Sequence, residues 1–193
     1  MDWTGVRQTP PGWDVNPSAW KQRLPIAGLA TVGFFIAGYL SLFQYDVVAT
    51  VWDPFFADGS REILTSEISN VFPIKDAALG AIGYLLDVIS GVAFGQSRWR
   101  TQPWAVIIFG FAVGPLGAGS VLLVILQPIA LGTFCTLCLT TALISVLMIG
   151  PAMDEVLASL QFLRRARDEG RSVWAAFWGW NDATELTQRG RPA

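Results

Sequence analysis

The stretch IALGTFCTLCLTTALISVLMI, residues 129–149, decides the fold class of this 193-residue chain. It carries no charge, and a run of about 20 mostly apolar residues can cross a bilayer as one α-helix. Gln127-Pro128 precedes it as a short break, and Pro151 follows it and helps to end the helix. The stretch therefore predicts a membrane-spanning helix that begins about six residues before Cys135.

Three further segments are apolar enough to cross a membrane, which predicts an all-α membrane protein built as a four-helix bundle. They run from about Ile26 to Tyr45, from Ala77 to Phe94 and from Trp104 to Leu126. Only 15% of the residues are charged, whereas soluble domains carry about 25%. The net charge of −2 gives no basis for nucleic-acid binding.

Basic residues set the expected orientation. Of the 13 lysines and arginines, all but Arg61 and Lys75 lie in segments that share one side of a four-span topology. The positive-inside rule places that side, with both termini, in the cytoplasm, and it places the 46–76 loop outside. We expect an integral protein of a bacterial inner membrane. Its expected parts are a cytoplasmic N-terminal segment (1–23), a membrane domain (24–150) and a cytoplasmic or interfacial amphipathic tail (151–193).

The first candidates for a chemical role are the two cysteines, Cys135 and Cys138. Two thiols three residues apart share a helical face, and a helix N-terminus stabilises a thiolate. The outer compartment is oxidising, so the pair is suited to thiol–disulfide exchange where a lipid-soluble quinone can reach it. The alternative is two buried cysteines that act as small apolar residues. Because the chain has no histidine and only these two cysteines, no metal site is expected.

Asp87 is a second candidate, because it falls near the middle of the predicted second span. A carboxyl group inside a membrane is costly and is usually functional. It would serve as a proton relay for quinone chemistry. Two alternatives remain open: a protonated carboxyl bonded to a neighbouring helix, or a span shifted so that Asp87 lies nearer the cytoplasmic edge.

Four local strings follow one another in a recognisable order. They are FIAGYLSL (35–42), TSEISNVFPI (65–74), ALGAIGYLL (78–86) and CTLCLTT (135–141). Together with four spans and a long loop after the first, they resemble the vitamin K epoxide reductase (VKOR) family. The resemblance covers roughly residues 24–150.

The resemblance implies a quinone as substrate or bound ligand. Within it, Cys138 attacks the quinone ring, and Cys135 exchanges electrons with a pair of shuttle cysteines in the outer loop. The residues carried over to the quinone pocket are Leu64, Ser66, Asp76, Gly80 and Phe134.

The chain departs from the family pattern in the outer loop. Alignment on Thr65-Ser66 puts one shuttle position at Ser60 and the other near Trp52, and neither is a cysteine. A tyrosine that some members place four residues after the second cysteine is Ala142 here. Two hypotheses follow. In one, the chain is a quinone-coupled oxidoreductase supplied by a separate thioredoxin-like or other thiol protein on the outer side. In the other, it is a non-catalytic subunit or anchor of a larger membrane complex, binding quinone or lipid.

Overall fold

The computed structural model describes residues 9–67, 69 and 73–180, and in these ranges the chain is helical, without strands. The elements, in chain order, are α1 (Trp20–Gln44), α2 (Gly59–Thr65), α3 (Asp76–Val92), α4 (Arg98–Thr101), α5 (Pro103–Leu131), α6 (Thr136–Asp168) and α7 (Val173–Phe177).

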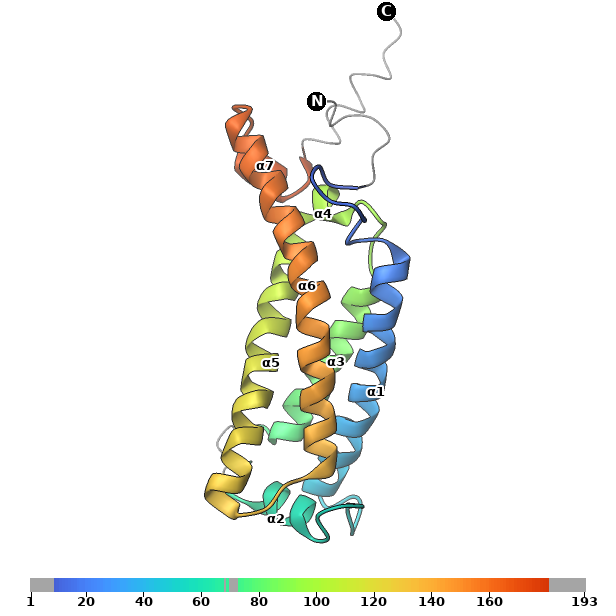
Figure 1. Cartoon of the computed structure of the whole chain (residues 1–193), viewed down its shortest axis with the longest axis vertical. Helices are drawn as coiled ribbons and strands as arrows, with labels where there is room; N and C mark the ends of the chain where they lie inside the picture. Colours follow the sequence, from blue (N-terminus) through green and yellow to red (C-terminus); the bar gives the residue numbers. More distant parts are fainter. Residues whose placement is uncertain (1–8, 68, 70–72, 181–193) are drawn as a thin grey trace, which may run out of the picture.

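The long helices α1, α3, α5 and α6 lie side by side and form the bundle, as Figure 1 shows. The short helix α2 closes one end, and α4 and α7 lie at the opposite end. Glycines permit close approach between helices. A Cβ atom on Gly33 would lie 2.6 Å from the ring of Tyr84, and one on Gly110 would lie 2.2 Å from Val156. Small residues therefore bring α1 against α3 and α5 against α6.

Three helices of the described chain, α1, α5 and α6, are long and apolar enough to cross a membrane. The fourth long helix, α3, has 17 residues and is shorter than these. The helical, membrane-type architecture is therefore as predicted from the sequence, whereas the count of four spans stays a prediction.

The expected break at Gln127-Pro128 is wrong. Helix α5 runs through Pro128 to Leu131, and Gly132 follows in the left-handed conformation, with φ of 69°. This conformation commonly ends helices, and glycine adopts it without a Cβ penalty. Helix α6 then begins at Thr136, with Cys135 as its N-cap. The last long helix thus starts at the CxxC motif itself and not six residues before it.

The expected end near Pro151 is also wrong, because α6 continues through Pro151 to Asp168. A proline inside a helix removes one backbone hydrogen bond, but the residues that follow Pro151 are packed against other elements. Val156 fits against Gly110. Beyond it lies a buried cluster of Trp99, Ala158, Phe162, Ala166 and Ala176.

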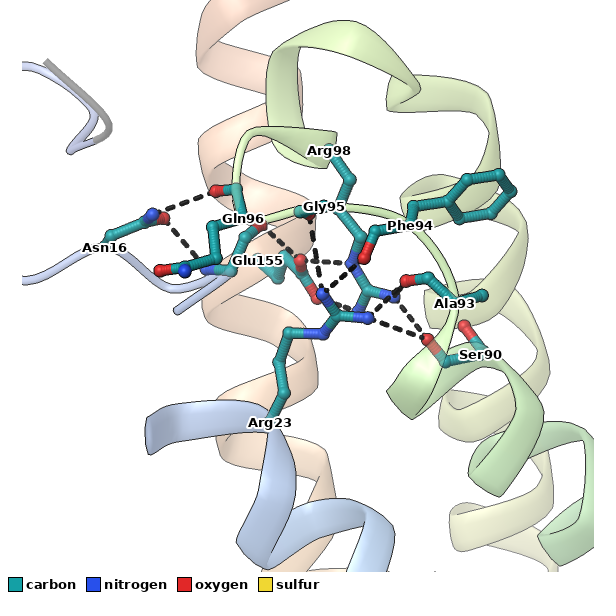
Figure 2. A network of polar contacts seen from close by, with 10 residues as sticks. Asn16, Arg23, Ser90, Ala93, Phe94, Gly95, Gln96, Arg98 and Glu155 are labelled. Carbon is teal, nitrogen blue, oxygen red and sulfur yellow. Dashed lines mark hydrogen bonds and ion pairs between the residues drawn. The ribbon is translucent and has the colours of Figure 1, made fainter. Parts of the chain in front are cut away.

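A buried polar network ties the chain together at the end of the bundle opposite the cysteines (Figure 2). Glu155 of α6 accepts hydrogen bonds from Nε of Arg98 at 2.5 Å, from Nη2 of the same residue and from the hydroxyl of Ser18. Arg23 of α1 donates to the carbonyls of Ala93 and Phe94, just beyond α3. The side chains of Arg98 and Glu155 are only 3% and 4% exposed. The network therefore fixes α1, α3, α4, α6 and the N-terminal segment to one another.

Helix α7 lies beside the start of α5. The ring of Trp178 is 5.8 Å from that of Trp104, which in turn is 6.1 Å from the ring of Phe94. Trp174 and Trp180 are largely exposed. Aromatic residues at the end of an apolar helix are typical of a membrane–water interface, and the interfacial position of the tail stays a prediction.

Candidate active site at the start of α6

The structure pairs Cys135 with Cys138 as a disulfide, with Cα atoms 5.2 Å apart. Cys135 is the N-cap of α6, and its sulfur accepts a hydrogen bond from the backbone N–H of Cys138 at 3.1 Å. One of the N–H groups left free at a helix start is thereby satisfied. Cys135 is fully buried, whereas Cys138 is half-buried. The two sulfurs therefore differ in access.

Gln127, near the end of α5, supports the pair from behind. Its Oε1 accepts the backbone N–H of Cys135 at 3.2 Å, and its side chain is 5% exposed. From the sequence, Gln127 is expected only as part of a helix break. The available signal was a single amide side chain in a long apolar run close to a CxxC motif, because such a group requires polar partners when buried.

Asp53 holds the loop between α1 and α2 against the start of α6. Its carboxylate accepts from the backbone N–H of Thr136 at 3.3 Å and from the Thr136 hydroxyl, and it accepts from the Ser60 hydroxyl at 2.6 Å. The backbone N–H groups of Phe55 and Phe56 also donate to it. Partial burial alone would raise the pKa of Asp53. The hydrogen bonds from Ser60, Thr136, Phe56 and Phe55 stabilise the charged form more strongly and hold that pKa well below its usual range.

The loop is also packed directly onto the residues before the motif. A Cβ atom on Gly59 would lie 2.3 Å from the carbonyl oxygen of Phe134 and 2.6 Å from the hydroxyl of Thr133. The rings of Phe56 and Phe134 are 5.4 Å apart. The loop therefore packs against the residues on both sides of Cys135, which is itself fully buried.

A cavity of about 290 Å³ extends into the bundle from Cys138. Of the residues predicted for a quinone pocket, Leu64, Ser66, Asp76 and Gly80 line this cavity with Cys138. Phe134 is not among its lining residues and packs against Phe56 instead. The structure thus gathers four of the five at one cavity, and their contact with a quinone stays a prediction.

The polar groups at the end of the cavity near α2 already have protein partners. Asp76 accepts from Nε2 of Gln44 at 2.6 Å and from the backbone N–H of Ala77 at 2.8 Å. The hydroxyl of Ser66 donates to the carbonyl of Ile63 at 2.7 Å. These contacts hold the end of α1, the end of α2 and the start of α3 around the cavity.

Asp87 lines the inner part of the same cavity. It is 5% exposed, and its Oδ1 has no hydrogen-bond partner among the described residues. One turn earlier, the hydroxyl of Tyr84 donates to the carbonyl of Thr141 at 2.6 Å and lies 2.8 Å from the hydroxyl of Ser145. The described helices therefore supply no partner for Asp87 Oδ1, so this atom does not show the helix-to-helix bond considered from the sequence.

The two positions aligned with shuttle cysteines have different surroundings. Ser60 is fully buried and bonded to Asp53, whereas Trp52 is 65% exposed. A hydrogen bond between a hydroxyl and a carboxylate thus occupies part of the loop where the resemblance expected thiols.

The Vitamin K epoxide reductase family model matches residues 24–152. That match covers well over half of the chain and confirms the resemblance, so the chain belongs to this family. No curated protein and no solved structure shows significant similarity to it. Family membership and the apolar helices make it an integral membrane protein. The family is one of membrane thiol–disulfide oxidoreductases, and this chain retains a cysteine pair, Cys135–Cys138.

Proposed function

We propose that the chain is a quinone-coupled thiol–disulfide oxidoreductase that receives its electrons from a separate thiol protein. One observation carries this proposal: Cys138, and not Cys135, lines the apolar cavity. In this proposal Cys138 reacts with the lipid-soluble electron acceptor, and Cys135 reacts with the thiol donor. The proposed topology has four spans, α3 included, with both termini in the cytoplasm of a bacterium.

The proposed reaction balances without a metal. In the reduced pair, the Cys138 sulfur attacks the quinone ring, and Cys135 then attacks Cys138 to form the disulfide. The two thiols lose two electrons and two protons, and the quinone becomes a quinol. A dithiol of the partner protein next attacks the Cys135 sulfur, forms a mixed disulfide and leaves as a disulfide, which restores both thiols.

The buried Cys135 adds a condition to the second half of this cycle. A partner thiol has to approach the Cys135 sulfur, but Cys135 is fully buried, and the loop held by Asp53 and Gly59 packs on the residues to either side of it. The cycle therefore includes an opening of this loop before the partner reacts.

Asp87 is assigned the role of a proton relay at the inner end of the cavity. Its unpartnered, buried Oδ1 supports this role, because an isolated polar atom in an apolar bundle is costly and is usually retained for function.

Single-turnover oxidation tests the proposal. The purified chain in nanodiscs is reduced with dithiothreitol, desalted and mixed with decylubiquinone, and quinol formation and free thiols are followed together. We expect one quinol per pair of thiols lost, with no quinol from Cys138→Ala or Cys135→Ala. If the variant with both cysteines replaced by Ala forms as much quinol as the wild type, the proposal is wrong.

The complete burial of Cys135 also favours a second candidate function, that of a non-catalytic subunit or anchor of a larger membrane complex. Trapping separates the two candidates. In Cys138→Ala, an active Cys135 should retain a thiol partner as a mixed disulfide that dithiothreitol releases. A stoichiometric partner that co-purifies in mild detergent and survives replacement of both cysteines would instead support the subunit.

A further inference from the structure

We propose that Gln127 is the hydrogen-bond donor for a carbonyl oxygen of the quinone, and that the same amide group positions Cys135. This assignment rests on the proposed function, because it requires a quinone beside Cys138. It names a residue outside the expected pocket set.

The orientation of the Gln127 amide follows from its partner. The backbone N–H of Cys135 can only donate, so the atom facing it at 3.2 Å is the acceptor Oε1. The NH₂ group therefore points away from Cys135. Gln127 lines the cavity that Cys138 also lines, and no described residue accepts a hydrogen bond from Nε2. A buried amide with an unused donor borders the cavity close to the cysteine pair.

The side-chain hydroxyls around the cavity are already committed as donors. Each gives its proton to a backbone carbonyl or to a neighbouring hydroxyl: Ser66 to Ile63, Ser69 to Leu64, Ser120 to Gly117, Thr141 to Cys138, Tyr84 to Thr141, and Ser145 to the oxygen of Tyr84. The amide of Gln44 is likewise bonded to Asp76 and Leu64. A quinone carbonyl is an acceptor only. Among the described amide and hydroxyl side chains of the cavity, Gln127 is the one that retains a free donor.

An N–H donor from Gln127 would favour reduction of a quinone bound in the cavity. Negative charge develops on the quinone oxygens as the ring accepts electrons, and an N–H group aimed at such an oxygen stabilises that charge. Because the other end of the same amide holds the N-cap residue of α6, Gln127 places the quinone and the cysteine pair relative to each other. Gln127 is thus a substrate-binding residue toward the quinone and a positioning residue toward Cys135.

Binding to the oxidised protein, which cannot turn over, tests the donor role. The probe is decylubiquinone labelled with ¹³C at its carbonyls, with affinity read from tryptophan quenching and the carbonyl stretch read by infrared difference spectroscopy. In the wild type, we expect the stretch of one carbonyl to fall on binding. Gln127→Met should abolish that shift and weaken binding about five- to tenfold, the usual effect of one lost hydrogen bond.

Leu122→Met is the matched control, because Leu122 lies on the same helix, is 56% exposed and does not line the cavity. It should keep both the affinity and the carbonyl shift. Gln127→Asn, which keeps an amide but is one methylene shorter, serves if Gln127→Met does not fold, and the same losses are expected. Unchanged affinity and an unchanged stretch in a folded Gln127 variant overturn this inference alone. A wild-type protein that does not bind the quinone overturns the proposed function as well.

Discussion

Thr136 donates both its backbone N–H, over 3.3 Å, and its hydroxyl to the carboxylate of Asp53, a residue 83 positions earlier in the chain. This relationship joins the loop between α1 and α2 to the first turn of the helix that carries the cysteines. A carboxylate at a helix N-terminus is favourable both as a hydrogen-bond acceptor and for its charge. It also holds the loop beside Cys135, which is fully buried, so we expect access to that sulfur to depend on Asp53.

Replacing Asp53 by Asn or Ala should expose Cys135, because the loop loses its bonds to Thr136 and Ser60. Alkylation of the reduced protein by iodoacetamide, mapped by mass spectrometry, should become at least several-fold faster at Cys135. The matched control is Asp58→Asn, since Asp58 is exposed and makes no capping hydrogen bond. Equal alkylation rates in wild type and Asp53→Ala would show that the loop does not limit access.

The same carboxyl group should make the loop contact sensitive to acid. The pKa of Asp53 is lower in the folded protein than the ordinary value of 3.8, so its stabilising contribution is complete above that value and is lost as the pH falls through the folded pKa. The difference in Tm between wild type and Asp53→Asn in detergent should therefore stay constant from pH 7 to about pH 5 and narrow below about pH 4. A difference that grows in acid would contradict this assignment.

Gly59→Ala should push the loop away from the cysteine motif. The new Cβ would meet the backbone oxygen of Phe134 at 2.3 Å, and backbone cannot give way as a flexible side chain can. We expect a loss of about 1–3 kcal/mol in the free energy of unfolding, as is usual for overpacking, together with faster alkylation of Cys135. Gly38→Ala is the control, because nothing lies within 4 Å of its added Cβ, and it should have little effect on either measurement.

Breaking the ion pair of Glu155 with Arg98 should strongly destabilise the opposite end of the bundle. Removing one partner of a buried pair leaves an uncompensated charge, which costs about 3–5 kcal/mol. Thermal unfolding of Glu155→Gln, Arg98→Met and the double variant forms a double-mutant cycle. The double variant should lose clearly less stability than the two single variants lose in sum. If the losses simply add, Glu155 and Arg98 have no energetic coupling.

Asp87→Leu should separate stability from function. The change removes a buried oxygen without a described partner, so thermal stability should stay equal or rise. If Asp87 relays protons, quinol formation should slow at least tenfold, with a changed solvent isotope effect. Asp87→Asn should show the same slowing, since it retains the shape but not the ionisable group. A variant that is stable and fully active would remove Asp87 from the mechanism.

The helical membrane architecture could be predicted from the sequence because apolar runs of sufficient length have few alternatives. The ends of the helices were harder to predict from the sequence. Pro128 and Pro151 both suggested ends, yet α5 and α6 run through them. Gly132 was the better signal for the end of α5, because its positive φ is a backbone requirement that few other residues meet.

The candidate site likewise contains residues that could be predicted from the sequence and residues that could not. The cysteine pair and four of the suggested cavity residues follow from local motifs and family resemblance. Asp53 and Gln127 could not be found that way, because their partners, Thr136 and the N–H of Cys135, become neighbours only when separate segments pack together. Long-range hydrogen bonds of this kind leave no periodic pattern in a sequence.

Helix α6 has 33 residues without interruption, so it is about 50 Å long at 1.5 Å per residue. Its first residue is bonded to Asp53, and its far half carries Glu155 and contributes Phe162 to the cluster that includes Trp99 of α4. One continuous helix therefore joins the cysteine motif directly to the polar network around Glu155. A change in the direction of its first turn would also displace its far end, with no chain of intermediate side chains between them.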